Sequence, residues 1–272
     1  MAPYLVQWIE YHALAGFDHF FVLNDCSTDL THDVLDHYAR SAPELVSYWA
    51  SPYDADSPAP PQCAPATHVP NEFESLDKLT KVARRQCEWI MAFDLDEYVT
   101  GVDLTFLGDF HAFLRQPGQV EQPGLGLKRL MWMVMGSHAL ERRPRHRLVI
   151  ETYTQNRMGF WIKTAARSEL VEGWAHSSHF PDLANDTLAL DPVRLQSPFA
   201  DEGDYEFAAT EGNRVCWRPR LDMFLRHYVY LSFEEYAATR ARRRYAPDGT
   251  QNMCALLLAQ ARETKLTRTR NV

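Results

Sequence analysis

The sequence predicts an α/β fold with a mostly parallel, doubly wound central sheet that helices flank. In the first part of the chain, amphipathic helical patterns alternate with short, continuously apolar strand patterns, as in parallel sheets covered on both faces. Strand patterns predominate later in the chain, which indicates additional β structure in the C-terminal half. The 272 residues suffice for a full core, and 46% hydrophobic with 24% charged residues is ordinary globular usage.

The first elements follow from periodicity and helix-ending residues. Apolar residues on one helical face predict a helix over residues 4–15, and Gly16 is expected to end it. Continuous apolar runs predict strands at residues 19–24 and 45–50. The remaining expectations for this part are a cap-rich turn at 24–31, a helix at 32–40, a proline-rich loop at 51–70, a helix at 71–88, a strand at 89–93 and a helix at 103–115.

The second half is expected to be rich in strands. Strand patterns occur at residues 125–135, 148–154, 161–167, 171–180 and 224–231. Residues 181–213 are expected to be irregular. Ser232, with Glu235 three residues later, predicts a capping box at the start of a final helix. No linker divides the chain into two domains.

Charge and composition exclude several classes of protein. The formal net charge of −8 argues against a general nucleic-acid binder, which needs a basic surface. No apolar run approaches 18 residues and no signal peptide is visible, so the chain as written is expected to be soluble, without a membrane segment. Five widely spaced cysteines form no CxxC pair and predict neither a disulfide framework nor a zinc site.

The sharpest chemical feature is Asp94-Leu95-Asp96, directly after the predicted strand at residues 89–93. Two carboxylates at alternate positions leaving a strand point to the same side, at the sheet edge where open α/β folds bind ligands. Like charges repel, so the pair is stable when it is solvated or bridges a cation. Carboxylate oxygens suit Mg²⁺ or Mn²⁺, which also bind substrate phosphates. The alternative interpretation is an acidic surface turn.

Histidines are the second candidate group, because imidazole could complete a metal shell that Asp96 begins. The chain has 11 histidines, among them His176, His179 and His227. The alternative is a hydrogen-bonded histidine in the core or at its rim. Sequence motifs of zinc peptidases, serine hydrolases, P-loop enzymes and dinucleotide-binding domains do not occur, so these classes have no support.

Several segments, in matching order over most of residues 3–244, resemble one known family. They are residues 4–12, 16–24, 27–29, 89–98, 132–137, 144–154, 163–167 and 227–236. This set resembles the family 92 glycosyltransferases and their family 2-like relatives. The resemblance implies a GT-A fold and transfer of a sugar from a nucleotide donor, expected to be UDP-linked, to a glycan or other hydroxyl acceptor.

The resemblance also implies roles for individual residues. Asp94 and Asp96 are expected to hold Mn²⁺ or Mg²⁺ against the donor diphosphate, where the metal acts as a Lewis acid. His179 is the first choice for a further metal or diphosphate contact, and His227 is the second. By analogy, a second group is expected near the nucleotide, namely Asn24, Asp25 and Asp29.

Transfer is expected to invert the anomeric carbon, with a carboxylate base that takes the acceptor's proton. Glu151, Glu172 and Asp222 are the candidates, and the sequence does not choose among them. The whole chain is expected to form one GT-A domain, with residues 1–120 as the nucleotide-sugar and metal half, 121–245 as the acceptor half and 246–272 as a tail.

One departure from the family bears on activity. Family members begin with a strand just before the segment that matches residues 4–8, so this sequence is expected to lack that strand and any N-terminal anchor. With such an anchor, the location would be the Golgi or secretory lumen. Two alternative functions remain: a catalytically degenerate domain that binds glycans or partners, and a DxD phosphohydrolase. The latter is disfavoured because Tyr98 stands where that chemistry needs Thr or Val.

Overall fold

The computed structural model describes residues 2–24, 27, 29–50, 72–101, 110–115, 126–174, 178–179, 181–184, 205–211, 214–219 and 223–239. The chain divides into two compact units. Unit 1 comprises Met1–Val134 and Arg157–His227, and unit 2 comprises Met135–Asn156 and Tyr228–Val272. Unit 1 therefore draws on both expected halves of the chain, whereas the predicted loop at 51–70 and the tail at 246–272 lie outside the described residues.

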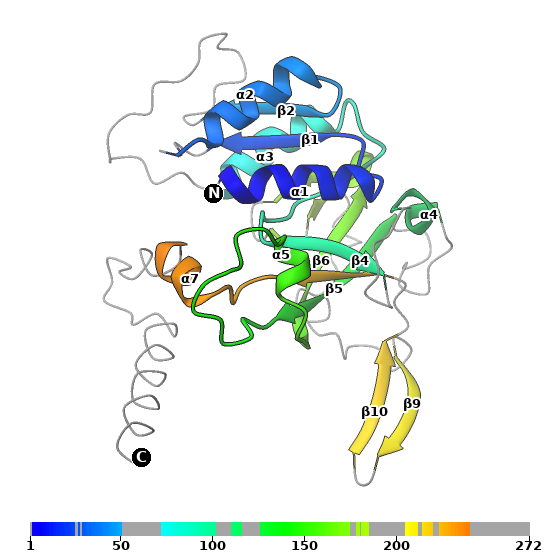
Figure 1. Cartoon of the computed structure of the whole chain (residues 1–272). Coiled ribbons are helices and arrows are strands. Elements are labelled where there is room, and N and C mark those ends of the chain that lie inside the picture. The colour runs from blue at the N-terminus through cyan, green and yellow to red at the C-terminus, as the bar shows by residue number, and fades with distance from the viewer. Residues whose placement is uncertain are drawn as a thin grey trace, which may run out of the picture. The chain divides into compact units, whose positions relative to one another are not determined.

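Unit 1 holds most of the described elements (Figure 1). Its helices are α1 (Ala2–Leu14), α2 (Thr31–Ser41), α3 (Glu72–Ala83), α4 (Phe110–Arg115) and the 3-10 helix η1 (Ser168–Leu170). Apart from Met135 and Asn156, which are strand ends assigned to unit 2, its strands are β1 (Phe20–Asn24), β2 (Val46–Ala50), β3 (Trp89–Met91), β4 (Glu97–Gly101), β5 (Leu127–Met135), β6 (Asn156–Arg167), β7 (Val171–Gly173), β8 (Asp182–Leu183), β9 (Tyr205–Glu211), β10 (Arg214–Pro219) and β11 (Met223–His227).

The α/β class is confirmed, but a mostly parallel central sheet is not. β1 and β2 form a parallel two-stranded sheet. The largest sheet has the order β3-β6-β5-β11-β4, in which β11 runs parallel to β5 but antiparallel to β4, and β3 runs antiparallel to β6. Two further antiparallel pairs, β7 with β8 and β9 with β10, complete the described strands.

Three sequence predictions are wrong in their local structure. Residues 148–154, expected as a strand, contain the short helix α5 (Val149–Thr152), because the Glu151 carboxylate accepts a hydrogen bond from the Leu148 amide at 3.0 Å and caps a helical turn. Residues 181–213, expected to be irregular, include β8 and β9. The strand expected at 171–180 ends at Gly173, where β7 ends.

The five-stranded sheet carries apolar side chains on both faces. The first core cluster contains Leu130 and Ala165 with Val99, Phe110, Met223 and Leu225. The second contains Ala166 with Ala92, Leu127, Val171 and Trp174. Ala165 and Ala166 are neighbours on β6, so their side chains point to opposite faces of the sheet. A strand buried on both faces explains why apolar residues occupy neighbouring positions here.

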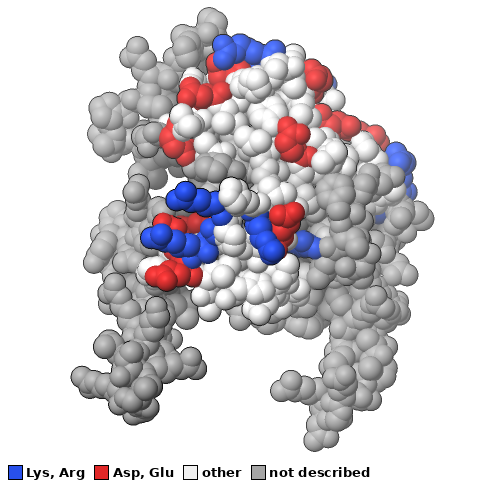
Figure 2. All heavy atoms as spheres, in the orientation of Figure 1, with Lys and Arg blue, Asp and Glu red and all other residues white. Residues whose placement is uncertain are grey.

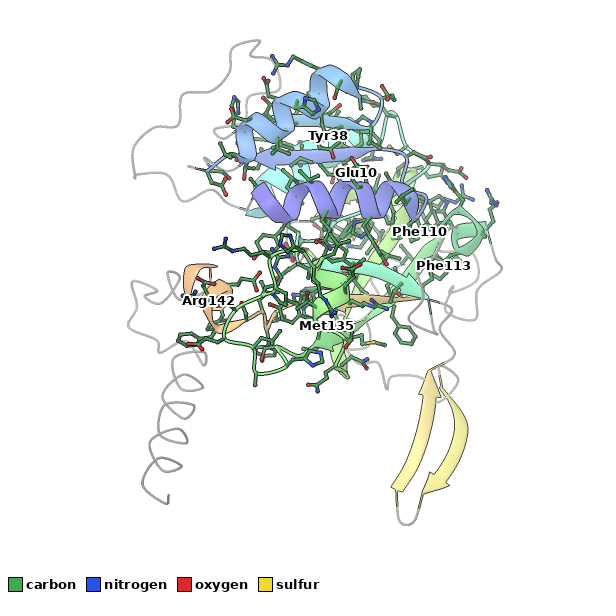
Figure 3. All side chains as sticks on the ribbon, in the orientation of Figure 1. Glu10, Tyr38, Phe110, Phe113, Met135 and Arg142 are labelled. Carbon is green, nitrogen blue, oxygen red and sulfur yellow. The ribbon has the colours of Figure 1, made fainter. Side chains whose placement is uncertain are left out.

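Helix α1 lies beside β1 and buries the face that its periodicity predicts (Figure 1). Leu5 and Ile9 are fully buried, and the Trp8 and Phe20 ring centroids lie 5.3 Å apart. Gly16 follows the helix with a φ of +97°, a conformation that glycine adopts without strain, so the predicted helix end is confirmed. On the opposite side, Tyr38 of α2 donates a hydrogen bond to the Glu10 carboxylate of α1 (Figure 3).

His12 of α1 is a core residue. It is fully buried, its Nδ1 lies 2.8 Å from the Trp8 carbonyl oxygen, and its Nε2 accepts the Val99 amide at 3.3 Å. Nδ1 therefore carries the proton of a neutral ring. Burial lowers the pKa of His12 to about 3, although the hydrogen bond to Trp8 opposes the shift.

Unit 2 contains α5 and the terminal helix α7 (Phe233–Thr239). The predicted capping box is confirmed: the Ser232 hydroxyl lies 2.6 Å from a Glu235 carboxylate oxygen, and the Glu235 amide donates back to it at 3.4 Å. Arg143 adds an ion pair to Glu235 at 2.9 Å. The loop before α5 carries three exposed arginines: Arg142, Arg145 and Arg147. Figure 2 shows Lys and Arg side chains next to Asp and Glu side chains on the face in view.

No described helix has both the length and the apolar character needed to cross a bilayer.

The buried His12 ring predicts a component of stability that is lost in acid. The unfolded side chain takes up a proton below pH 6.5 and the folded one only near pH 3, so falling pH favours the unfolded chain. Between pH 7.5 and 5 the loss amounts to about 2 kcal/mol. Urea unfolding at both pH values should show that wild type loses about this much more stability than His12→Gln. Parallel losses in both proteins would contradict the assignment.

Candidate active site

The two aspartates predicted as a ligand site lie in a tight turn between β3 and β4, which we call the carboxylate turn (residues 94–97). The Glu97 amide donates to the Asp94 carbonyl at 3.1 Å, the hydrogen bond of a four-residue β-turn. The Asp94 side chain is 57% exposed and that of Asp96 is 19% exposed. One carboxylate is thus open to solvent and the other is partly enclosed.

The turn is fixed from the side of α1. The Trp8 indole N–H lies 3.0 Å from both the Asp94 and the Glu97 carbonyl oxygen, and shares its hydrogen between them. The Glu97 carboxylate accepts the Asp94 amide at 2.8 Å. These contacts hold the backbone at both ends of the turn. The positions from which the two aspartate side chains project are therefore fixed.

Glu97 and Lys163 form a buried ion pair beneath the carboxylate turn. Both side chains are fully buried, and the Lys163 Nζ lies 3.5 Å from a Glu97 oxygen. The same Nζ lies 3.5 Å from Asp94 Oδ2 and donates to the Ser178 hydroxyl at 3.4 Å. Burial raises the pKa of Glu97 well above its ordinary value, while the Lys163 ammonium opposes that rise.

Asp96 faces a histidine on β11. His227 Nε2 lies 3.5 Å from Asp96 Oδ1, and the His227 ring packs edge-on against Trp132 of β5 with centroids 3.9 Å apart. The His179 ring packs against the same indole, with the two ring centroids 5.1 Å apart. His179 and His227 therefore both lie against Trp132, and His227 is the one paired with the carboxylate turn. His176, the third histidine that the sequence singled out, lies outside the described residues.

The residues expected near the nucleotide follow β1. Asn24 is buried at the end of β1, where its side-chain oxygen accepts the Ser27 amide at 3.2 Å. Asp29 accepts the Ala2 amide at 3.1 Å and the Thr31 amide at 3.0 Å, which are the first amides of α1 and α2. Asp25 lies outside the described residues. The proposed nucleotide contacts of all three residues stay predictions.

The candidate bases occupy different places. Glu172 is exposed on β7 in unit 1, whereas Glu151 lies in unit 2 and caps α5. Asp222 lies outside the described residues. The structure therefore shows a structural use for Glu151 and none for the Glu172 side chain within the part of the chain that it describes.

The donor set at the carboxylate turn fits one kind of metal site. No group of three or more His, Cys, Asp or Glu side chains placed to hold a metal occurs within the described ranges. Mg²⁺ and Mn²⁺, however, are often held by one or two carboxylates together with substrate phosphates, and Asp94 with Asp96 supplies that pair. Such a cation would need the bound diphosphate to complete its coordination.

Sequence reasoning singled out Asp94, Asp96 and the two histidines, but gave no role to Lys163, Trp8 or Trp132. Lys163 and Trp132 lie within segments that carry the family resemblance, and Trp8 lies on the predicted buried face of the first helix. Trp8 and Lys163 contact the turn, and Trp132 contacts the two histidines. These contacts join distant parts of the chain, which local patterns do not encode.

Comparison with known proteins supports one family. Residues 2–116 match the sequence model described as Glycosyltransferase family 92. The match bears out the resemblance, supports a family 92 glycosyltransferase and indicates glycosyl transfer in general. It includes Trp8 and the carboxylate turn, while Lys163 and His227 lie beyond it. No curated protein and no solved structure matches the chain.

The buried ion pair predicts that Lys163→Met is strongly destabilising, because Glu97 is left without its counter-charge. A loss of about 3–5 kcal/mol is expected in urea unfolding at pH 7.5. Glu97 then favours its neutral form, because its pKa is higher in the folded than in the unfolded chain. The folded variant therefore takes up a proton first, and its stability should increase as pH falls from 8 to 5.

The matched control is the double variant Lys163→Met/Glu97→Gln, which removes both charges. It should be more stable than Lys163→Met at pH 7.5 and lack the gain toward pH 5. An exposed ion pair contributes less than about 1 kcal/mol to stability. A loss that small for Lys163→Met would contradict a buried, paired Glu97.

Proposed function

We propose that this chain transfers a sugar from a UDP-linked donor to a hydroxyl acceptor, with the donor diphosphate bound at the carboxylate turn. The observation that carries the proposal is the pair of carboxylates, Asp94 and Asp96, at a turn whose backbone Trp8 and Glu97 fix. The turn lies within the residues that match glycosyltransferase family 92. Fixed carboxylates favour a cation at one position relative to the donor, which orients the reacting bond.

We infer that Asp94 and Asp96 hold Mn²⁺ or Mg²⁺ when the donor is present. Such a cation, when bound, neutralises charge that grows on the leaving diphosphate. Lys163 orients the Asp94 carboxylate from below, and His227 does the same for Asp96. His179 packs against Trp132, the residue on which His227 packs, so His179 remains the candidate for a further contact with the metal or diphosphate.

Transfer with inversion needs a base near the acceptor hydroxyl. Among the three candidates, Glu172 fits best, because its side chain is exposed and lies in the same unit as the carboxylate turn. Glu151 caps α5 through the Leu148 amide and lies in unit 2. We therefore propose that Glu172 takes the proton as the hydroxyl oxygen attacks the anomeric carbon.

A second candidate function is donor or glycan binding without turnover. The observation that favours it is that both aspartates already face a protein cation or a group that can become one: Lys163 for Asp94 and His227 for Asp96. These pairs reduce the negative charge available to a metal. Release of UDP from a UDP-sugar separates the two functions, since only the enzyme produces it.

The carboxylate turn predicts metal-dependent binding of UDP. In a calorimetric titration of UDP, wild type should bind in the presence of Mn²⁺, and Asp96→Asn should lose at least tenfold in affinity. Because Asn keeps the size and shape of the partly enclosed Asp96 side chain, the melting temperature should change little. The matched control is Glu169→Gln, another carboxylate-to-amide change at an exposed position, which should bind as wild type does.

Equal binding by Asp96→Asn and wild type would contradict a metal role for the turn. So would a loss of binding that is matched by a loss of folded protein.

The proposed base predicts a selective effect on turnover. Glu172→Gln should lower kcat by about 10²–10⁴-fold, the contribution of a general base, and leave the affinity for UDP unchanged. Glu151→Gln should affect stability more than kcat, because it weakens the cap of α5. If Glu172→Gln retains wild-type kcat in a UDP-release assay with acceptor present, Glu172 is not the base.

A further inference from the structure

Charge is divided unevenly between the two compact units. Unit 2, which comprises residues 135–156 and 228–272, holds 12 Lys and Arg against 6 Asp and Glu, so its formal charge is +6. The whole chain carries −8, so unit 1 carries −14. A basic unit on an acidic chain attracts an anionic partner to that unit.

The described part of unit 2 has all four of its arginines in one loop, which we call the arginine loop (residues 142–147). The loop reads Arg-Arg-Pro-Arg-His-Arg and lies between β5 and α5. The Arg147 amide donates to the Pro144 carbonyl at 3.1 Å, which closes a β-turn with Arg145 and His146 at its tip. Arg145, His146 and Arg147 are all exposed.

Arg143 braces this loop from within. Its Nε forms the ion pair with Glu235 of α7 at 2.9 Å, and the two side chains are only 22% and 13% exposed. Its Nη1 lies 3.5 Å from the Arg147 carbonyl oxygen. Arg143 therefore ties the turn to α7 and serves the structure of the loop.

Both ends of the arginine loop are also held. Before the loop, the Leu140 carbonyl accepts the Phe233 amide at 2.9 Å. After it, the Glu151 carboxylate accepts the Leu148 amide at 3.0 Å. A loop that is fixed at its ends and braced inside loses little conformational freedom when a ligand binds.

The other three guanidinium groups are open to a ligand. Arg142, labelled in Figure 3, lies 3.6 Å from Glu234, and these side chains are 77% and 60% exposed, so the pair is weak. Within the part of the chain that the structure describes, the Arg145 and Arg147 guanidinium groups have no ion-pair partner. Each guanidinium presents a planar fork of donors that matches a carboxylate or a tetrahedral oxyanion.

The distribution of charge indicates what kind of anion fits. The described residues of unit 2 hold four glutamates as well as the four arginines, and Glu141 and Glu234 are exposed. A membrane surface or a nucleic acid presents continuous negative charge, which would meet these glutamates too. A polymer with separate acidic groups can place each group at an arginine, and an acidic glycan is such a polymer.

We propose that the arginine loop binds an acidic glycan, whose carboxylate or sulfate groups pair with Arg145 and Arg147. The choice of a glycan rests on the proposed function, because sugar transfer needs an acceptor, and the loop adds that this acceptor is anionic. Binding at the loop requires neither the nucleotide donor nor a metal.

The test is a calorimetric titration of the whole chain at low salt, without UDP or Mn²⁺. The ligands are a galacturonic acid hexasaccharide and a chondroitin sulfate hexasaccharide, and at least one should bind saturably, with an affinity that falls as NaCl is added. The matched control ligand is the methyl-esterified galacturonic acid hexasaccharide, which keeps the sugar chain but loses its charges. It should bind at least tenfold more weakly than the acidic form.

Arg145→Gln/Arg147→Gln tests the site from the side of the protein. This double variant should lose at least tenfold in affinity at a near wild-type melting temperature, because both side chains are exposed. The matched control is Arg84→Gln/Arg85→Gln, which removes two exposed arginines from unit 1 and changes the net charge equally. It should bind as wild type does, and equal affinities of the two double variants would overturn the assignment to the arginine loop.

Two further results would overturn the proposal. The first is no binding of either acidic hexasaccharide. The second is equal binding of a glutamate hexapeptide, which would indicate an acidic peptide as the ligand. Release of UDP from a donor together with no binding of acidic glycans would contradict this inference alone. Binding of an acidic glycan without UDP release from any donor would contradict sugar transfer alone.

Discussion

The arrangement of the site depends on one buried ion pair, Glu97 with Lys163. Glu97 begins β4 and Lys163 lies on β6, and both side chains are fully buried. Glu97 also holds the Asp94 amide, while Lys163 reaches the Asp94 carboxylate. A buried pair costs desolvation energy that its attraction scarcely offsets, so the pair contributes to the geometry of the site more than to stability. Here it fixes the turn that presents both aspartates.

A protein cation lies among the carboxylates of this turn before any ligand binds. The Lys163 ammonium lies 3.5 Å from both the Asp94 and the Glu97 carboxylate and lowers the repulsion between them. Asp96 faces His227, whose ring packs on Trp132. A divalent cation that binds together with a diphosphate would add charges of both signs. The fixed backbone would keep the carboxylates in place while the cation and diphosphate bind.

Local patterns predicted what local interactions determine. The periodicity of α1, its end at Gly16 and the Ser232–Glu235 capping box are set within a few residues, and the structure confirms them. Pairing of β3 with β6 and of β4 with β11 joins residues far apart in sequence, so the mixed sheet did not follow from alternation of elements. For the same reason the aspartates could be predicted, but Lys163 and Trp8 as their supports could not.

If the carboxylate turn serves a glycosyltransferase, as we propose, the chain must turn over a nucleotide-sugar donor. The measurement is the release of UDP from UDP-galactose and other UDP-sugars by the purified chain with Mn²⁺, with and without a glycan acceptor. The account predicts metal-dependent release for at least one donor, lost in Asp94→Asn. No release from any donor, by a chain that still binds UDP and Mn²⁺, would contradict catalysis and leave a binding domain.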